Sequence, residues 1–535
     1  MGNKKPPKEP DDNDRRISEP NFHPDMDPKL VPFERDKKAP PAKGKSSKPD
    51  PQNVRPESQA KVLIDLAESH GVELFRSAGT VYAAADIGPR RATMLIQSSE
   101  FGALLLRWLY DAGQHTASEL TIKQAQQSLA ARAQYGGQER SVFVRVGRAG
   151  DAVYLDLGDD TGRAVETTAK GWQIIDRPPV HFVRSLSMRA LPVPVLGGDL
   201  ADLFLVFGLP AEQRPLLLAW LVAALRPSGP FPVLAVHGEQ GSGKSTVSRL
   251  VRALFDPHEA DLRGPPPDDR TLYISTRHSW VLGYDNLSTI PRWLSDALCC
   301  IATGGAYASR RMYSDDGEML FRAQRPILLN GIEEIATRPD LLERCIVLSL
   351  PTIPEEHRRP EDALWRQYRE MQPRLLGALL NAVVCALQEL PNVRLPRAPR
   401  MVDFAMWATA AEPALGLQSG EFLTSYFANL QAAADLPLEA SPIVAPLRVL
   451  LDKQQRTLDG QGPCWTGTAT ALLRELRACD KAEDNRPPDW PRNGQALSGQ
   501  LKRLAPNLRQ KGIQVNFDRQ TDSKRTRTIS VRSDP

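Results

Sequence analysis

The spacing of apolar residues changes along the chain, and each change predicts a different kind of unit. Between residues 59 and 198, apolar positions with helical periodicity are mixed with short runs in which apolar and polar residues alternate. Apolar residues three and four apart indicate an amphipathic helix, whereas alternation indicates a half-buried strand. The pattern predicts an N-terminal α+β domain with helices near residues 61–69, 100–110 and 118–134 and strands near residues 80–85, 92–97, 142–146 and 152–157.

From residue 199 to 351 the pattern changes to helices separated by short, fully apolar runs at residues 231–237, 279–284 and 326–329. Strands that are apolar on both faces are typical of a parallel sheet with helices on either side. We therefore expect an α/β core here, followed by a helical subdomain over residues 352–435 whose first helix is interrupted near Pro373. After a linker at residues 436–463, a small unit over residues 464–535 is expected to contain helices and strands near residues 469–479, 495–509, 512–517 and 525–531.

The composition of residues 1–58 distinguishes this N-terminal tail from the units that follow it. Residues 1–58 contain twelve prolines, charges of both signs and almost no aliphatic side chains. Such a segment cannot bury enough apolar surface to offset the loss of chain entropy on folding. We predict that this tail is disordered.

Charge and cysteine usage narrow the class of protein. The longest apolar run, residues 216–225, is too short to cross a bilayer, and the first residues are hydrophilic, so we expect a soluble, cytoplasmic protein with no membrane partner. The six cysteines show no Cys-x-x-Cys spacing, which argues against a disulfide framework and a zinc site. A net charge of +4 on 535 residues is close to neutral. A nucleic-acid partner can therefore be inferred only from where the charge collects.

A phosphate-binding loop lies at the start of the α/β core. The apolar run at residues 231–237 leads directly into a G-x-x-x-x-G-K-[ST] motif, and a good helix follows at residues 247–255. Glycines let backbone N–H groups close around phosphate oxygens, and a helix N-terminus favours negative charge. We expect ATP or GTP here, with Lys244 on the β- and γ-phosphates and the Ser245 hydroxyl on Mg²⁺. The predicted nucleotide-binding residues are Gly238, Glu239, Gln240, Gly241, Ser242, Gly243, Lys244, Ser245 and Thr246.

Polar residues that follow two later strands are further catalytic candidates. Asp285 comes directly after the run at residues 279–284, where a Walker B aspartate would hold Mg²⁺ through water, although it could instead cap a helix or turn. The glutamate expected beside it is replaced by Asn286, so the sequence does not indicate which residue would be the catalytic base. Asn330 ends the run at residues 326–329 and is a candidate sensor of the γ-phosphate or of the attacking water. A turn residue before Gly331 is the alternative.

An acidic cluster in the N-terminal domain permits two interpretations. Asp156, Asp159 and Asp160 could hold a metal ion, as the carboxylates of a primase or nuclease do. Asp and Gly are also the residues that a tight turn requires, and glycines flank this segment at 158 and 162. Turn chemistry is the interpretation that we favour.

The order of the motifs resembles superfamily 3 helicases of the viral and plasmid primase-helicase type, which are relatives of the AAA+ ATPases. Besides the phosphate loop, Asp285 and Asn330, the resemblance rests on Thr303-Gly304-Gly305, on Arg310-Arg311-Met312-Tyr313 and on Asp340-Leu341-Leu342-Glu343-Arg344. It covers about residues 232–351. The chain departs from the family pattern at two positions. Asn286 replaces the second residue of an acidic pair, and Cys300 stands where a basic residue is usual before the Thr-Gly-Gly motif.

The resemblance implies a ring, in the form of a homo-hexamer, with nucleotide at the subunit interfaces. Arg344 would then be an arginine finger that completes a neighbour's site, while a surface pair with Glu343 or Asp340 is the alternative. Arg397 and Arg400 are candidates for a second sensor, or are ordinary surface charges. A hairpin in the channel of the ring is expected to grip DNA through Tyr307, Arg310, Arg311 and Tyr313, while a basic hairpin on the surface without a DNA role is the alternative.

Basic residues collect at the C-terminus. Residues 492–532 contain ten Lys or Arg and only two acids, on a predicted helix and a two-stranded hairpin. A helix with a basic hairpin is the arrangement of a winged-helix domain that binds DNA, although an acidic protein partner or a flexible basic tail is the alternative. The candidate DNA contacts are Lys502, Arg503, Lys524, Arg525 and Arg527.

The sequence predicts an α/β P-loop ATPase core, which the resemblance implies is of the AAA+ or superfamily 3 helicase type, with an N-terminal α+β domain, a helical lid subdomain and a C-terminal winged-helix-like domain. The hypothesis is an ATP-dependent DNA helicase or translocase of the replicative type, encoded by a phage, plasmid or integrative element. It would act on single-stranded or duplex DNA, with other replication proteins as possible partners. An ATP-dependent DNA-binding switch or loader is the alternative that Asn286 favours. A P-loop kinase or other small-molecule enzyme is a third, which the basic C-terminus disfavours.

Overall fold

The computed structural model describes residues 58–113, 116–287, 290–310, 318–331, 338–439, 441–455, 464–480, 487, 490–519 and 527–533. These residues belong to one unit that begins at Ser58. The tail predicted at residues 1–58 lies outside the described residues except for Ser58.

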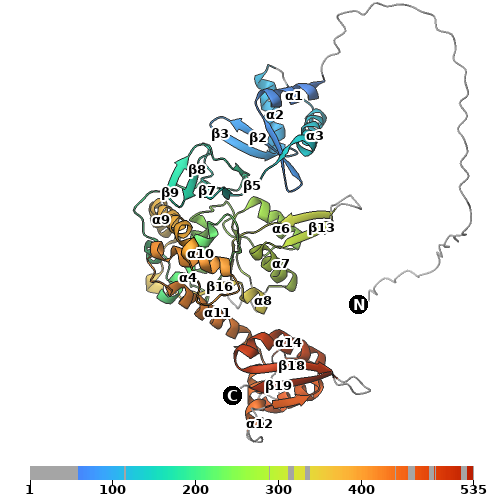
Figure 1. Cartoon of the computed structure of the whole chain (residues 1–535), viewed down its shortest axis with the longest axis vertical. Helices are drawn as coiled ribbons and strands as arrows, with labels where there is room; N and C mark the ends of the chain where they lie inside the picture. The colour runs from blue at the N-terminus through green and yellow to red at the C-terminus, as the bar shows by residue number, and fades with distance from the viewer. Residues whose placement is uncertain are drawn as a thin grey trace, which may run out of the picture. The chain divides into compact units, whose positions relative to one another are not determined.

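The first part of the fold is the predicted α+β domain, in which three helices pack on one four-stranded sheet (Figure 1). Ser58, Ser98 and Ser118 each accept a backbone N–H at the start of a helix, which satisfies donors that the first turn leaves free. The strand order is β3-β2-β1-β4. The elements are α1 (Gln59–Ser69), β1 (Glu73–Ser77), β2 (Thr80–Ile87), β3 (Arg90–Leu95), α2 (Ser99–Asp111), α3 (Glu119–Gly136) and β4 (Gln138–Glu139).

A small β domain follows, built from a four-stranded antiparallel meander and a short parallel pair, β5 with β10. It makes its own small cluster around Tyr154 and Phe182, but Val146, Val153 and Leu155 belong to the apolar cluster of the α/β core. The β domain is therefore packed onto that core. Its strands are β5 (Val142–Phe143), β6 (Val146–Ala149), β7 (Ala152–Asp156), β8 (Ala164–Thr168), β9 (Gly171–Ile175) and β10 (His181–Phe182).

The α/β core has the parallel sheet that the apolar runs predicted, with the strand order β12-β15-β11-β16. Its strands and helices are η1 (Leu200–Leu205), η2 (Ala211–Gln213), α4 (Arg214–Ala224), β11 (Val233–His237), α5 (Lys244–Ala253), α6 (Asp269–His278), β12 (Leu282–Tyr284), α7 (Arg292–Thr303), β13 (Ala306–Arg310), β14 (Glu318–Arg322), β15 (Ile327–Asn330), α8 (Pro339–Leu342) and β16 (Cys345–Ser349).

Alternate residues of these strands face opposite sides of the sheet. Leu234 and Val236 of β11 belong to the cluster that includes α4 and α5, whereas Val233 belongs to the cluster around α6 and α7. Both faces of the sheet are thus covered, which is the reason for the fully apolar runs. β12 is shorter than predicted, because only Leu282–Tyr284 of the run at residues 279–284 pairs with β15.

The helical subdomain packs on the same face as α4. It consists of η3 (Glu355–His357), α9 (Glu361–Glu389), η4 (Leu390–Asn392), α10 (Val402–Ala411), η5 (Glu412–Leu415) and α11 (Glu421–Glu439). Contrary to the predicted interruption, α9 continues through Pro373. The backbone of Val195 runs against the helix at this point: its N–H donates to the Pro373 carbonyl at 2.9 Å, and its carbonyl lies where a side chain on Gly377 would be.

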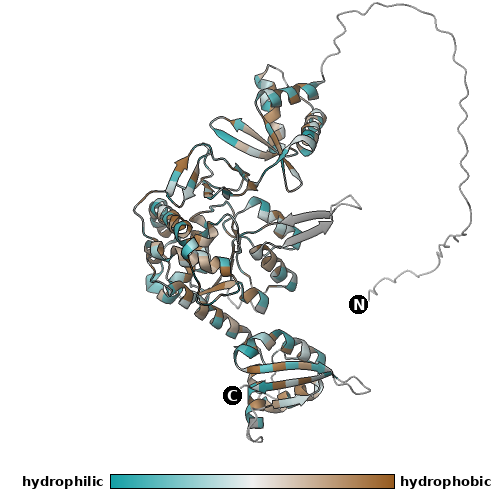
Figure 2. Cartoon of the chain, viewed as in Figure 1, coloured by the Kyte–Doolittle hydropathy of each residue, from teal (hydrophilic) through white to brown (hydrophobic). Residues whose placement is uncertain are grey.

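By length and composition, one helical stretch of the described residues, Glu361–Asn392, could span a membrane. Half of its apolar window is buried inside the protein, as in a core helix. Figure 2 shows the apolar residues gathered in α10 and the helices next to it, while α3 and α14 mix hydrophilic and apolar residues.

The C-terminal unit has three helices and the three-stranded antiparallel sheet β17-β19-β18. The predicted linker at residues 436–463 was wrong in part, because α12 lies within it and buries Leu447, Leu450 and Leu451 in the core of the C-terminal unit. α11 also runs past the expected boundary at residue 435. The elements are α12 (Val444–Gln455), β17 (Cys464–Gly467), α13 (Ala469–Cys479), α14 (Gly494–Gln510), β18 (Ile513–Arg519) and β19 (Arg527–Ser533).

Candidate functional site: a phosphate loop at the sheet edge

The phosphate loop joins the end of β11 to the start of α5. Gly238, Gly241 and Gly243 have φ values of 153°, 84° and 77°, in the region that side chains disfavour. A side chain at Gly238 would also meet the Leu350 carbonyl and the Ser242 hydroxyl at 2.6 Å. The motif glycines are therefore required by the shape of the loop, and they leave backbone N–H groups at the N-terminus of α5.

Lys244 is the charged residue inside this loop. Its Nζ donates to the carbonyls of Gly238 and Glu239 at 2.6 and 2.7 Å. Burial lowers the pKa of the ammonium, and the nearby Asp285 carboxylate partly opposes this shift. The charge is thus held in a pocket of backbone dipoles, where a phosphate is a stronger partner than a neutral carbonyl.

Ser245 and Asp285 meet across the sheet edge. The Ser245 hydroxyl donates to Asp285 Oδ1 at 3.2 Å, and the backbone N–H of Asp285 donates to the Arg263 carbonyl at 2.8 Å. The structure brings the two predicted Mg²⁺ residues together although they are forty positions apart. A hydroxyl and a carboxylate are ligands that fit Mg²⁺, either directly or through water.

Asn330 ends β15, the strand that lies between β11 and β12. Its Oδ1 accepts the backbone N–H of Asn286 at 3.3 Å. Its Nδ2 is buried and has no hydrogen-bond partner among the described residues. A buried donor without a partner is costly, so a ligand that accepts from it is favoured. Asn286 has a φ of 56°, in the left-handed region that asparagine adopts more readily than most residues with a side chain.

A cavity of about 410 Å³ beside the phosphate loop was not anticipated from the sequence. It is lined mainly by residues 204–208, residues 351–354 and His357, together with Ser242, Gly243 and Thr246. The Ile353 N–H donates to the Gly241 carbonyl at 3.3 Å, and Thr352 Oγ1 donates to Glu239 Oε2 at 3.2 Å. The segment after β16 therefore lies against the loop. The two prolines at 351 and 354 signalled a turn there, but not what the turn would cover.

Arg344 lies at the opposite edge of the sheet from the phosphate loop. It directly precedes β16, and its carbonyl accepts the N–H of Val233, the first residue of β11. Since β11 and β16 are parallel, Arg344 is about 16 Å, or five strand residues, from the edge that carries the loop. Its Nη1 donates to the Asp340 carbonyl, and its Nε is buried without a partner among the described residues.

Arg397 and Arg400 lie near Glu343, the residue that precedes Arg344, and not near the phosphate loop. Arg400 forms an ion pair with Glu343, and Arg397 lies 4.7 Å from the centre of the Phe427 ring. Both line a cavity of about 430 Å³ that also includes residues of α14. The structure does not bring them to the phosphate loop of their own chain.

The candidate DNA contacts are described only in part. β13 and β14 pair as an antiparallel hairpin, as expected, with Tyr307 and Arg310 on β13. Arg311 and Tyr313 lie outside the described residues, as do Lys524 and Arg525 of the C-terminal hairpin. Lys502 and Arg503 are exposed on α14, and Arg527 is exposed on β19.

The acidic cluster near residue 156 is a turn. Asp159 Oδ1 accepts the backbone N–H groups of Thr161, Gly162 and Arg163, and Asp156 is buried and paired with Arg184. Turn chemistry therefore explains Asp159, and the ion pair with Arg184 explains Asp156.

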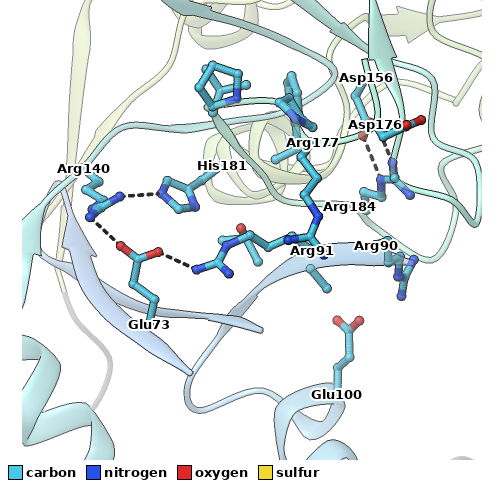
Figure 3. Close-up of a pocket in the computed structure, with 17 residues that line it drawn as sticks. Glu73, Arg90, Arg91, Glu100, Arg140, Asp156, Asp176, Arg177, His181 and Arg184 are labelled. Atoms are coloured by element: carbon cyan, nitrogen blue, oxygen red, sulfur yellow. Dashed lines mark hydrogen bonds and ion pairs between the residues drawn. The ribbon is translucent and has the colours of Figure 1, made fainter. Parts of the chain in front are cut away.

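Next to this turn lies a cavity of about 240 Å³ between the α+β domain and the β domain (Figure 3). Glu73 accepts from both Arg91 and Arg140, and the ring of His181 contacts Arg140 from the other domain. The lining contains five arginines and four acids, so its charge is nearly balanced. We assign no chemistry to it.

Two stretches of the chain are similar to families of replication proteins. Residues 199–436 match the family described as actinomycete integrative conjugative element replication protein, and residues 445–535 match the C-terminal domain of the same proteins. The first match includes the phosphate loop, Asp285, Asn330 and Arg344. This part of the chain is thus similar to a replication protein of a mobile element, in line with the expected class.

No curated protein matches the chain significantly. Among solved structures, SCCmec type IV Cch, described as an active helicase, is 11% identical with a TM-score of 0.43, over 86% of this chain and 93% of that chain. The apo C-terminal region of NrS-1 is 11% identical with a TM-score of 0.39, over 88% and 98%. The superposition is too loose for either structure to define the fold.

Proposed function

We propose that the chain is an ATP-dependent DNA helicase or translocase that serves the replication of an integrative conjugative element. The observation that carries the proposal is the convergence of Lys244, Ser245, Asp285 and Asn330 at one edge of a parallel sheet. The family match to replication proteins supports the link to DNA.

In this proposal the phosphate loop binds ATP with Mg²⁺. Lys244 exchanges the two loop carbonyls for the β- and γ-phosphates, and the cavity beside Ser242 and Thr246 receives the base. Ser245 and Asp285 hold Mg²⁺, which neutralises charge on the phosphates when it is bound. The free Nδ2 of Asn330 then donates to the γ-phosphate or to the attacking water.

Movement on DNA is assigned to the β13–β14 hairpin and to the C-terminal unit. The order of three helices and a three-stranded sheet in that unit supports a winged-helix-like domain, with α14 carrying Lys502 and Arg503. The position of Arg344, away from its own phosphate loop, supports action across a subunit interface in a homo-hexamer. Such a protein acts in the cytoplasm with other replication proteins.

The direct test is strand displacement on a forked duplex, measured together with ATP turnover. Wild-type protein is expected to hydrolyse ATP faster when single-stranded DNA is added and to separate the strands only with ATP and Mg²⁺. Absence of both nucleotide binding and turnover would refute the proposed site.

A switch or loader without unwinding activity is the second candidate, and Asn286 is the observation that favours it. Asn286 stands where a catalytic glutamate is expected, in a left-handed backbone conformation in which its N–H donates to the side chains of Asp285 and Asn330. ATP-dependent DNA binding with slow turnover and no strand displacement would support this candidate.

A further inference from the structure

Arg145 is buried at the junction between the β domain and the α/β core. It lies between β5 and β6, its side chain has no exposed surface, and its φ is 64°. A left-handed conformation is unfavourable for a residue with a side chain, and it persists where the surroundings require it. Arg145 lies outside every motif of the sequence.

The guanidinium of Arg145 binds four oxygens from three segments of the chain. Nε donates to Asp256 Oδ1 at 3.1 Å, and Nη1 donates to the Asp156 carbonyl at 3.1 Å. Nη2 donates to the carbonyls of Arg189 and Pro257 at 2.7 and 3.2 Å. One side chain thus connects the β domain, the segment that follows it, and the end of the phosphate-loop helix.

Asp256 extends this connection to the strand that precedes Asp285. The carboxylate lies just beyond α5 and is 1% exposed. Its Oδ1 accepts from Arg145, while its Oδ2 accepts the backbone N–H of Val281 at 2.8 Å and lies 3.7 Å from Arg252 Nη2. Asp256 therefore fixes the far end of α5 to the residue before β12.

We propose that Arg145 is a positioning residue of the nucleotide site, acting through Asp256 on α5 and β12. These two elements are held together at both ends: by Asp256 at one end, and by the hydrogen bond between Ser245 and Asp285 at the other. Helix and strand rises put about 15 Å between the two junctions. The inference rests on the proposed function, since it concerns the geometry of that same site.

The direction of the effect follows from the geometry. Loss of the Arg145 contact leaves the buried Asp256 carboxylate with Arg252 and the Val281 N–H alone, so its position, and with it the spacing of α5 and β12, is less tightly fixed. A displacement of about 1 Å at reacting groups costs roughly 100-fold in rate, whereas ground-state binding spread over the whole phosphate loop is less sensitive. We therefore expect kcat to fall more than the KM for ATP rises.

The test compares Arg145→Met, Arg145→Lys and a matched control, Arg184→Met. Arg184 also binds Asp156, through the carboxylate, but no described contact of its side chain reaches the α/β core. Arg145→Met is expected to lower kcat by roughly 10-fold or more with KM for ATP within about 3-fold, and Arg145→Lys to recover part of the loss. The control is expected to keep kcat within about 2-fold. A similar loss in the control, or unchanged kcat in Arg145→Met, would overturn the proposal.

Amide hydrogen exchange provides a readout that needs no ATPase activity. In nucleotide-free protein, Arg145→Met is expected to speed exchange at residues 281–285 and 246–253, and Arg184→Met to leave these segments as in wild type. If Arg145→Met does not fold, Asp256→Asn provides the same comparison with a side chain of the same shape. Unchanged exchange in these segments refutes the coupling, whereas a wild-type protein without ATP binding refutes the proposed function.

Discussion

The lysine of the phosphate loop illustrates how a buried charge is prepared for a ligand. The Lys244 ammonium is bound by two carbonyls of its own loop, and burial lowers its pKa. Both effects describe a cation with too little negative charge around it. A triphosphate supplies that charge, so the energy of binding comes from an arrangement already present in the folded loop.

Lys244→Ala should therefore weaken ATP binding without unfolding the protein. Loss of a hydrogen bond to a charged group corresponds to about 2–3 kcal/mol, or roughly 100-fold in Kd. Isothermal calorimetry with a non-hydrolysable ATP analogue measures the change, and the thermal midpoint checks the fold. Lys170→Ala, at an exposed turn, is the control. Equal affinity of wild type and Lys244→Ala would show that this loop is not the nucleotide site.

Asp285→Asn separates metal binding from nucleotide binding. The variant keeps the shape of the side chain and an oxygen for the Ser245 hydroxyl, but it removes the negative charge. We expect ATP affinity to change little and turnover to fall by roughly 100-fold, as for residues that orient a metal through its ligands. Turnover at several Mg²⁺ and Mn²⁺ concentrations measures it. Full turnover at low Mg²⁺ would exclude Asp285 from the metal site.

These residues could be predicted from the sequence because their chemistry is local. The phosphate loop is contiguous, and Asp285 and Asn330 each follow an apolar run whose parallel pairing sends both to one edge. Arg145 could not be predicted, since its partner Asp256 is 111 positions away and neither belongs to a motif. The cavity beside the phosphate loop was missed for the same reason: residues 204–208 meet residues 351–354 and His357 only in the folded chain.

At the scale of elements, the C-terminal unit shows where a hydrophobic pattern is ambiguous. Residues 444–455 fall within the linker predicted at residues 436–463, and the sequence has prolines at 442 and 446. Pro446 lies in the first turn of α12, where the missing N–H costs no helical bond, and the leucines that follow pack on α13. Whether this helix packs on a neighbour or lies free depends on tertiary contacts that its own sequence does not record.

The exposed cations of this unit give a prediction about DNA. Replacement of Lys502, Arg503 and Arg527 by alanine should lower DNA affinity and reduce the slope of log K against log salt concentration by up to about 3, since each phosphate contact releases a counterion. Fluorescence anisotropy with a labelled oligonucleotide at several salt concentrations measures both. Arg474→Ala, exposed on α13, is the matched control. An unchanged slope in the triple variant would favour a protein partner for this surface.

A truncation tests the same unit as a whole, and α12 determines where the cut belongs. A chain that ends at residue 463 keeps α12 but exposes Leu447 and Leu450, so we expect it to aggregate. A chain that ends at residue 440 removes the helix with its core and should remain monodisperse while binding DNA more weakly. Light scattering and anisotropy compare the two. If the chain that ends at residue 463 is soluble and monodisperse, the packing of α12 on the C-terminal core is contradicted.

At the scale of the whole molecule, the sheet keeps Arg344 too far from the phosphate loop of its own chain to contact a nucleotide there. Arg344 is at the amino end of β16, and the phosphate loop is at the carboxyl end of β11, so the two lie at opposite edges of the same parallel sheet. An arginine that stabilises charge on the γ-phosphate must touch it. If Arg344 has this role, it acts on the nucleotide of another subunit.

Arg344→Ala should then bind ATP normally but lose roughly 1000-fold in turnover, as for other arginine fingers. Mixed with Lys244→Ala, it should recover part of the activity, because some interfaces then combine an intact loop from one chain with an intact arginine from the other. A residue that acts within its own chain cannot be complemented in this way. Doping either variant into wild type at constant total protein should reduce activity more steeply than in proportion if the subunits of a ring act together. A linear decrease, with no recovery in the mixture and a monomeric mass in the presence of ATP and DNA, would contradict the ring and leave the DNA-binding switch as the better account.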